Sequence, residues 1–237
     1  VITGTASGIG RAQAQAFLQQ GAYVYGIDEQ PATIEHPKYL HFEGSVTDTF
    51  FLRKSLDALE EVHILCNTAG LLDGYAKTLE TEENLWDKIF NVNVKGLYNV
   101  TNVVLPKMLV KQSGVIINMA SIAAKACLGG FSVYSATKAA VLAATASLGR
   151  EAALDNVTVN CICPGIIKTS MWEEILDQLA GDDQVARDKV WAEWTAGTPN
   201  GKPQDPIDIA YMTAYLCTEE VRYNTSQNIG VDGGYTF

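Results

Sequence analysis

The chain has 237 residues, of which 47% are hydrophobic, and its net charge is −10. This length suits one α/β domain with a sizeable core, and the hydrophobic content excludes a disordered chain. The acidic charge and the lack of a basic run argue against nucleic acid and against an anionic membrane surface as partners.

The five cysteines are an odd number and include no CxxC pair. Cys161 and Cys163 would point to one face of a strand without a second ligand pair, so we expect buried reduced thiols and no metal site. Reduced thiols, the lack of a signal-peptide pattern and the lack of a long apolar run favour a cytoplasmic location. The chain opens at Val1 without a methionine, so we expect it to begin inside its first strand, with a few residues missing.

Short apolar runs alternate with segments of helical periodicity along the chain. In chain order the pattern predicts a strand at 1–3, a helix at 8–20, strands at 22–27 and 38–42, a helix at 48–59, a strand at 62–66, a helical tract at 82–111, a strand at 114–119, a helix at 132–153, a strand at 157–162, a helix at 205–218 and a strand at 227–231. The strands are apolar at nearly every position, as burial on both faces requires. We therefore predict an α/β fold with a single Rossmann-like, doubly wound parallel sheet of about seven strands, flanked by helices on both faces.

Two stretches depart from this alternation. The stretch 28–45 is short and contains Pro31 and Pro37, so we expect a loop where a sheet-covering helix would otherwise lie. The stretch 165–204 is irregular and contains three of the four tryptophans, which suggests a partly helical substrate flap within the single domain 1–237. An oligomer contact is the alternative interpretation of this stretch.

Glycines at 4, 8 and 10 lie between the first strand and the first helix, with Ser7 and Ile9 among them. Glycine allows a tight turn and a close approach of the backbone to phosphate, and the helix N-terminus offers free N–H groups. The pattern favours a dinucleotide pyrophosphate site, and an ordinary strand-to-helix turn is the alternative.

Asp28 ends the second predicted strand, 18 residues after Gly10. A carboxylate at this position can accept hydrogen bonds from the adenosine ribose hydroxyls, and it would repel a 2′-phosphate. Neither Glu29 nor Gln30 supplies a positive charge, so we predict NAD(H) over NADP(H).

Tyr134 and Lys138 are four residues apart on a predicted helix, and Ser121 follows a predicted strand. Residues at this spacing share a helix face, and a nearby ammonium favours the phenolate form of a tyrosine whose pKa is ordinarily near 10. Tyr134 could then exchange a proton with an alcohol or carbonyl oxygen that Ser121 holds by a hydrogen bond. A surface contact is the alternative for the Tyr–Lys pair alone.

These motifs, in this order, resemble the short-chain dehydrogenase/reductase family over essentially the whole chain. TGTASGIG (3–10) is similar to the family's TGxxxGIG, Ser121, Tyr134 and Lys138 to its Ser and YxxxK motifs, and VDGGY (231–235) to its last strand. The resemblance implies that Lys138 and Tyr134 also contact the cofactor and that Asn93 holds a water in a proton relay to Lys138.

The resemblance also implies further cofactor and substrate contacts. Asn67, Ala69 and Gly70, from a stretch similar to NNAG, and Val46 would line the adenosine side, while Pro164, Gly165, Ile167 and Thr169 would lie at the nicotinamide. Substrate contacts are expected from Ser121, Ala123, Leu128, Tyr134, Met171 and Trp172. Ser45 stands where the family usually has Asp, and Thr68 replaces an Asn.

The resemblance implies an NAD-preferring oxidoreductase acting on the CH–OH group of a small or medium secondary alcohol, or on the corresponding ketone. The alternative is a 3-oxoacyl-[acyl-carrier-protein] reductase, although Asp28 disfavours the NADPH that such enzymes usually use. A non-catalytic NAD sensor is a remote alternative, because the catalytic residues are all present. The family's dimer interfaces, on helices near 95–111 and 132–153, predict a homotetramer or homodimer.

Overall fold

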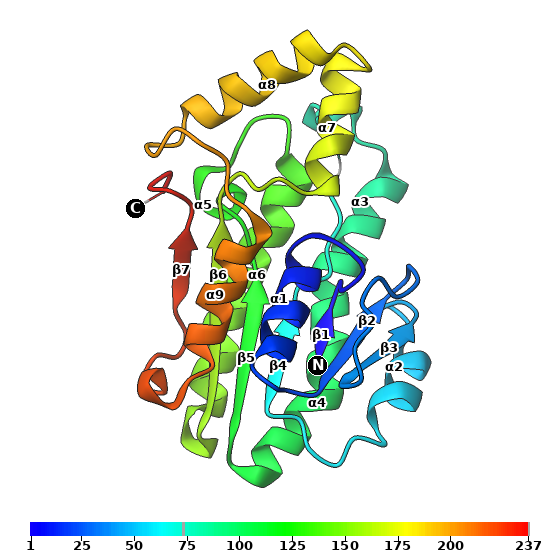
Figure 1. Ribbon diagram of the computed structural model, residues 1–237, viewed down its shortest axis with the longest axis vertical. Helices are drawn as coiled ribbons and strands as arrows, with labels where there is room; N and C mark the ends of the chain where they lie inside the picture. Colours follow the sequence, from blue (N-terminus) through cyan, green and yellow to red (C-terminus); the bar gives the residue numbers. More distant parts are fainter. Residues whose placement is uncertain (73, 237) are drawn as a thin grey trace.

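The computed structural model describes residues 1–72 and 74–236, and its centre is a seven-stranded sheet in the order β3-β2-β1-β4-β5-β6-β7. All six neighbouring pairs are parallel. The strands are β1 (Ile2–Thr3), β2 (Val24–Asp28), β3 (Tyr39–Glu43), β4 (Ile64–Asn67), β5 (Gly114–Met119), β6 (Val157–Pro164) and β7 (Asn228–Val231). The predicted parallel sheet is therefore confirmed. Strands β1 to β3 follow one another toward one edge of the sheet and β4 to β7 toward the other, so the chain changes its direction of winding between β1 and β4 (Figure 1).

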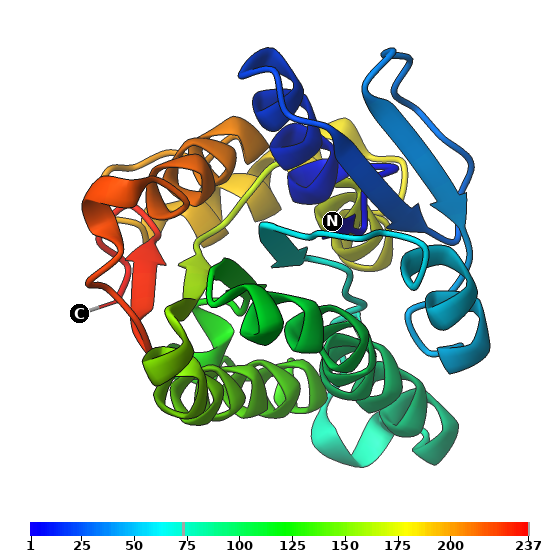
Figure 2. The same cartoon turned by 90° about the horizontal axis from the view of Figure 1, so that it is seen from below.

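Helices cover both faces of this sheet, as a doubly wound fold requires (Figure 2). The α-helices are α1 (Gly8–Gln19), α2 (Thr49–Leu56), α3 (Glu83–Phe90), α4 (Leu97–Lys111), α5 (Ala123–Ala126), α6 (Ser132–Ala152), α7 (Ser170–Ala180), α8 (Gln184–Ala196) and α9 (Pro206–Leu216). Helices α1 and α9 pack together on one face, while α2, α4 and α6 cover the other. None of the described helices combines the length and apolar character needed to cross a bilayer.

The two faces of the sheet carry separate hydrophobic clusters. On β5, Ile116 packs with residues of α4, including Val104 and Met108, whereas Val115 and Ile117 pack toward α1 and α9. All three side chains are essentially inaccessible to solvent. This alternation with a period of two explains why the strand is apolar at nearly every position, with Asn118 as the polar exception.

Several expected boundaries differ from the structure. The tract 82–111 is not one helix, because a π-helical segment, Asn91–Gly96, separates α3 from α4. Strand β6 extends two residues beyond the predicted end at 162, since Cys163 and Pro164 pair with Gly230 and Val231 of β7. The prediction of a loop between β2 and β3 is confirmed, as residues 29–38 of the described structure contain no helix.

Candidate active site

A cavity of about 940 Å³ opens at the carboxyl ends of the strands, where ligands bind in folds of this type. Its walls come from the loop before α1, the ends of β2, β4, β5 and β6, and helices α6 and α7 (Figure 1). Most of the residues predicted from the sequence meet there: Gly4, Ser7, Gly8, Ile9, Gly10, Asp28, Ser45, Val46, Ala69, Gly70, Ser121, Ala123, Leu128, Tyr134, Lys138, Pro164, Gly165, Ile167, Thr169, Met171 and Trp172. Asn67 and Asn93 lie outside the lining and are described below.

The glycine loop has the backbone geometry that only glycine adopts without strain. Gly4 and Gly8 have φ values of +77° and +50°, and a Cβ on Gly10 would overlap the carbonyl oxygen of Gly4. Ser7 precedes α1 without capping it through its side chain, and the first turn of α1 contains no acidic residue. The first N–H groups of α1 therefore face the cavity as donors, which fits the pyrophosphate of a dinucleotide.

Asp28 lies at the carboxyl end of β2 in the cavity wall. Its Oδ2 accepts a hydrogen bond from Ala6 N (3.0 Å) and its Oδ1 accepts one from Gln30 N (2.9 Å). These two bonds orient the carboxylate, and each of its oxygens retains further acceptor capacity. The side chain is thus held in place at the end of the glycine loop.

The loop between β2 and β3 packs directly on the glycine loop. Thr33 Oγ1 donates to Ala6 O (2.8 Å), and Tyr39 of β3 donates from its hydroxyl to Thr5 Oγ1 (2.9 Å). The Tyr39 ring also lies close to Gly26, where any side chain would collide with it. A short loop and one tyrosine therefore hold the glycine loop where no helix covers it.

Tyr134 and Lys138 lie one turn apart on α6, and both line the cavity with Ser121. The Lys138 ammonium is 5.5 Å from the centroid of the Tyr134 ring and donates to Met119 O (2.9 Å). Ser121 Oγ accepts a bond from Ala123 N (3.1 Å), so its own hydroxyl hydrogen can be donated elsewhere. The three residues expected to act together are thus brought to one wall.

Lys138 is buried with only 4% of its surface exposed. Burial lowers the pKa of its ammonium from the ordinary lysine value of 10.5 to about 8, while the neighbouring Cys161 and Cys163 act in the opposite direction. The cation is therefore retained at neutral pH but held less firmly than that of an exposed lysine. Cys161 and Cys163 are themselves buried free thiols beneath it.

Asn93 lies in the π-helical segment, with its side chain directed toward the loop after β4. Its Oδ1 accepts from Leu71 N (2.7 Å), and its Nδ2 donates to Leu71 O (2.9 Å) and Thr137 Oγ1 (3.0 Å). Thr137 in turn donates to Tyr134 O (2.8 Å). Asn93 is thus joined to the helix that carries Tyr134 and Lys138, and sequence reasoning did not identify Thr137 as the connecting residue.

Asn67 is buried and ties the sheet to the helix beside it. Its Nδ2 donates to Thr101 Oγ1 of α4 (3.1 Å) and Asn118 Oδ1 of β5 (2.9 Å). Its side chain thus links β4 to β5 and to α4, and it does not line the cavity. The next residue, Thr68, does line the cavity, and its hydroxyl donates to Gln13 of α1.

The remaining predicted cofactor residues lie at the two ends of the cavity. Val46 contacts Gly96, and its carbonyl oxygen accepts a bond from Asn99 of α4 (3.1 Å). At the other end, Gly165 N donates to Gln204 Oε1 (3.0 Å). Thr169 precedes α7, and its side chain lies beside Gly8. The start of the flap therefore packs against the glycine loop.

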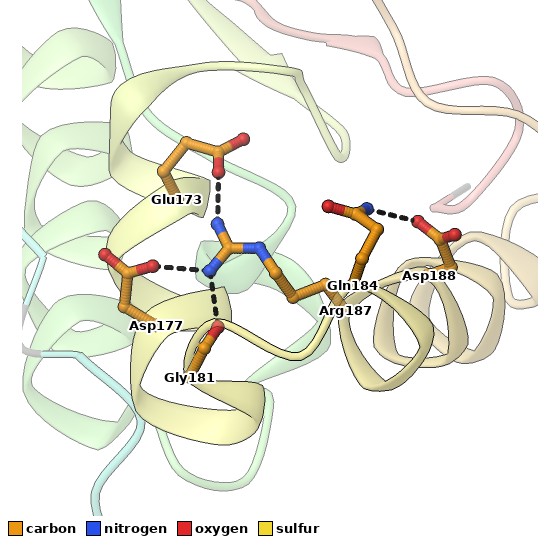
Figure 3. A network of polar contacts seen from close by, with 6 residues as sticks. All are labelled: Glu173, Asp177, Gly181, Gln184, Arg187 and Asp188. Atoms are coloured by element: carbon orange, nitrogen blue, oxygen red, sulfur yellow. Dashed lines mark hydrogen bonds and ion pairs between the residues drawn. The ribbon is translucent and has the colours of Figure 1, made fainter.

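The predicted flap, 165–204, contains two helices, α7 and α8, joined by a short turn at Gly181. Arg187 of α8 forms ion pairs with Glu173 and Asp177 of α7 and donates to Gly181 O (2.8 Å), as Figure 3 shows. Asp183 caps α8 by accepting from the backbone N–H groups of Val185 and Ala186. These polar contacts hold the two helices as a unit at the cavity mouth.

Sequence reasoning missed several cavity residues. Phe131, Trp194 and Tyr235 line the cavity, as do Asn84, Asp87, Lys88 and Asn91 at the junction of α3 and the π-helical segment. Trp194 lies within the predicted flap, but its spacing from Trp172 does not indicate that both face one cavity. The sequence does contain one signal for Phe131, because it lies three residues before Tyr134 and so close to the predicted catalytic group.

A family model described as "Enoyl-(Acyl carrier protein) reductase" matches residues 4–236. A 3-oxoacyl-[acyl-carrier-protein] reductase of Chlamydia pneumoniae is 33% identical over all of this chain and 96% of its own length. The chain belongs to the short-chain dehydrogenase/reductase family. Its resemblance to this family is thereby confirmed, and the protein is a short-chain oxidoreductase.

Solved structures of other short-chain enzymes superpose on it closely. The ligand-free aldohexose dehydrogenase of Thermoplasma acidophilum is 28% identical, with a TM-score of 0.92 over 99% of this chain and 92% of that one. A 3-ketoacyl-(acyl-carrier-protein) reductase of Brucella melitensis, solved with NADH, is 25% identical, with a TM-score of 0.90 over 100% and 97% of the two chains. The family uses a nicotinamide cofactor, and its members act on chemically different small molecules.

Proposed function

We propose that this short-chain oxidoreductase uses NAD(H) to interconvert a small or medium secondary alcohol and the corresponding ketone. The observation that carries the proposal is the meeting of Ser121, Tyr134 and Lys138 with the glycine loop in one cavity. When bound, the nicotinamide would accept or supply the hydride. The chain supplies the binding groups and the proton transfer.

Each catalytic residue has a distinct task in this proposal. Tyr134 takes the proton from the alcohol, or gives it to the carbonyl oxygen, and Ser121 donates a hydrogen bond to the same oxygen. The Lys138 ammonium, 5.5 Å from the Tyr134 ring centroid, favours the phenolate electrostatically. Asn93 holds the loop after β4 against α6 and would support a water-mediated proton path to Lys138.

The preference for NAD(H) rests on Asp28. Its oriented carboxylate would accept bonds from the adenosine ribose hydroxyls and repel the 2′-phosphate of NADP(H). The first-turn N–H groups of α1 would bind the pyrophosphate, and Ala69, Gly70, Pro164, Gly165, Ile167 and Thr169 would contact the rest of the cofactor.

The second candidate is a 3-oxoacyl-[acyl-carrier-protein] reductase, which the names of the similar proteins favour. An acidic carrier protein requires a basic docking surface, and a chain with a net charge of −10 supplies little positive charge for one. Asp28 also disfavours NADPH. The two candidates therefore differ most clearly in substrate, because the similar reductase of Brucella melitensis was itself solved with NADH.

We further propose that residues 1–237 form one dinucleotide-binding and catalytic domain, with 165–204 as its substrate flap. We expect a cytoplasmic protein, since all five cysteines are free thiols. We also expect a homotetramer or homodimer, because exposed apolar side chains such as Tyr98 and Val110 lie on α4.

The test is a panel of secondary alcohols, diols, hydroxyacids, sugars and 3-oxoacyl thioesters, followed at 340 nm with both cofactors. We expect turnover of a secondary alcohol or simple ketone, faster with the NAD(H) pair. In Tyr134→Phe, turnover should fall by about a thousandfold or more, while NADH binding persists. A thioester preference with NADPH would favour the carrier-protein reductase, and activity that survives in Tyr134→Phe would remove Tyr134 from its role.

A further inference from the structure

Three aromatic rings from separate segments form a continuous surface in the cavity wall near Tyr134. Phe131 directly precedes α6, Trp172 lies on α7 and Trp194 lies on α8. The ring centroids of Phe131 and Trp194 are 5.5 Å apart at 74°, and those of Trp172 and Trp194 are 5.4 Å apart at 67°. These are edge-to-face contacts of the kind that aromatic pairs prefer.

Two further rings, which are not in the cavity lining, pack against this surface. Tyr75 packs on Phe131 at 5.5 Å, and Trp191 packs on Trp172 at 5.5 Å. The Arg187 ion pairs hold α8, which carries Trp194, against α7, which carries Trp172 (Figure 3). Trp194 is half-buried, so part of its ring remains open to a ligand in the cavity.

The charges in the cavity wall disfavour an anionic substrate. Among the described lining residues the acidic ones are Asp28, Glu29, Asp87 and Glu174, and the basic ones are Lys88 and Lys138. Lys138 is engaged with Met119 O and the Tyr134 ring, and Lys88 is an exposed residue next to Asp87 in α3. Glu174, two residues after Trp172, places a negative charge on the flap itself. A substrate carboxylate at the aromatic surface would lose water without gaining a described cation as partner.

We propose that the substrate is an uncharged ketone or secondary alcohol with an apolar ring attached to the reacting carbon, and that Trp194 selects the ring. This inference rests on the function proposed above. The ring would lie against the surface formed by Phe131, Trp172 and Trp194, with the oxygen directed to Ser121 and Tyr134. Burial of a phenyl-sized ring on such a surface contributes more binding free energy than burial of a methyl group. This difference in free energy creates the selectivity for the ring.

The test compares three 2-oxo compounds that differ in one feature at a time. Methyl benzoylformate and benzoylformate differ in charge, while methyl benzoylformate and methyl pyruvate differ in the ring. Each is reduced at its ketone by one hydride from NADH and one proton, which gives the 2-hydroxy compound and NAD⁺. We expect kcat/KM for methyl benzoylformate to exceed that for benzoylformate by about a hundredfold and that for methyl pyruvate by about tenfold.

Substitutions then assign the ring preference to Trp194. Trp194→Leu should lower the ratio of kcat/KM for methyl benzoylformate to that for methyl pyruvate by about tenfold. Trp194→Phe, which keeps a ring, should retain most of this ratio. The control is Trp86→Leu, since Trp86 lies on α3 against Phe90 and outside the cavity lining. NADH binding, followed by fluorescence, should be the same in all variants, which separates a local effect from unfolding.

The proposal is overturned if kcat/KM for benzoylformate equals that for methyl benzoylformate. It is also overturned if the ratio of kcat/KM for methyl benzoylformate to that for methyl pyruvate does not depend on Trp194. Faster oxidation of an aldohexose than of 1-phenylethanol would also overturn it, as would a lack of turnover of all three 2-oxo compounds. The underlying function is judged separately, on whether any substrate of the wider panel is turned over in a Tyr134-dependent manner.

Discussion

At the scale of single residues, Lys138 carries a charge that folding buries. Its pKa of about 8 in the folded protein lies below the ordinary lysine value of 10.5, so the unfolded chain binds the proton more tightly. The charged ammonium therefore destabilises the fold below pH 8, and this penalty decreases as the pH rises from 8 to 10.5. If Lys138 has its proposed catalytic role, this loss of stability is the kind that accompanies a buried charge in an active site.

We accordingly predict that Lys138→Met inactivates the enzyme and stabilises it by about 2 kcal/mol at pH 7. The gain should shrink at pH 9.5, where the wild-type lysine is mostly neutral. Urea denaturation followed by circular dichroism at both pH values measures the difference. The control is Lys125→Met, an exposed lysine of α5. An equal gain at both pH values would contradict this account.

Asp28 offers a second test at the same scale. Asp28→Asn removes the charge but keeps the shape, so we expect the ratio of kcat/KM for NADPH to that for NADH to rise by about tenfold or more. The matched control is Glu43→Gln, which removes one charge at the end of the neighbouring strand, outside the cavity lining. A similar rise in both variants would mean that overall charge, and not Asp28, sets the preference.

At the scale of elements, the flap depends on the contact between α7 and α8. Arg187 is largely shielded, with 15% of its side chain exposed, whereas Lys189 and Glu193 form a 3.9 Å pair on the surface of α8. Because Arg187 bridges two helices and a turn carbonyl, its loss should loosen the flap, while loss of Lys189 should have little effect.

We predict that Arg187→Gln accelerates chymotrypsin cleavage within 170–200 several-fold and raises the substrate KM more than it changes NADH binding. Lys189→Gln should behave like the wild type in both assays. An unchanged cleavage rate in Arg187→Gln would show that aromatic packing alone holds α7 and α8 together.

Elements also show where local sequence patterns were sufficient. The loop 29–38 was predictable, because two prolines in a short stretch exclude a helix whatever lies around it. The interruption of the 82–111 tract was not, because the π-helical segment coincides with long-range bonds from Asn93 to Leu71 and Thr137. Periodicity within the tract contains no information about partners outside it.

At the scale of the whole molecule, α4 and α6 cover the same face of the sheet (Figure 2). Tyr98 and Val110 of α4 are 61% and 83% exposed, so this helix offers two apolar side chains to a partner. We predict a mass of two or four times 25.6 kDa by light scattering, and a shift to smaller species in Tyr98→Arg. Phe50→Arg, at an apolar position of α2 that is 77% exposed, should keep the native mass, because α2 is not one of the helices expected in the interface. A monomeric wild type would refute the assembly.

The sequence by itself determined the class of fold, the glycine loop between the first strand and the first helix, and the identity of the proposed catalytic residues. It could do so because glycine geometry, strand burial and the spacing of Tyr134 and Lys138 on one helix are local properties. The tertiary structure decided which distant side chains share the cavity, namely Phe131, Trp172 and Trp194, and how Thr137 connects Asn93 to Tyr134. Such meetings depend on how helices pack over the sheet, since the packing surfaces are formed only once the chain has folded.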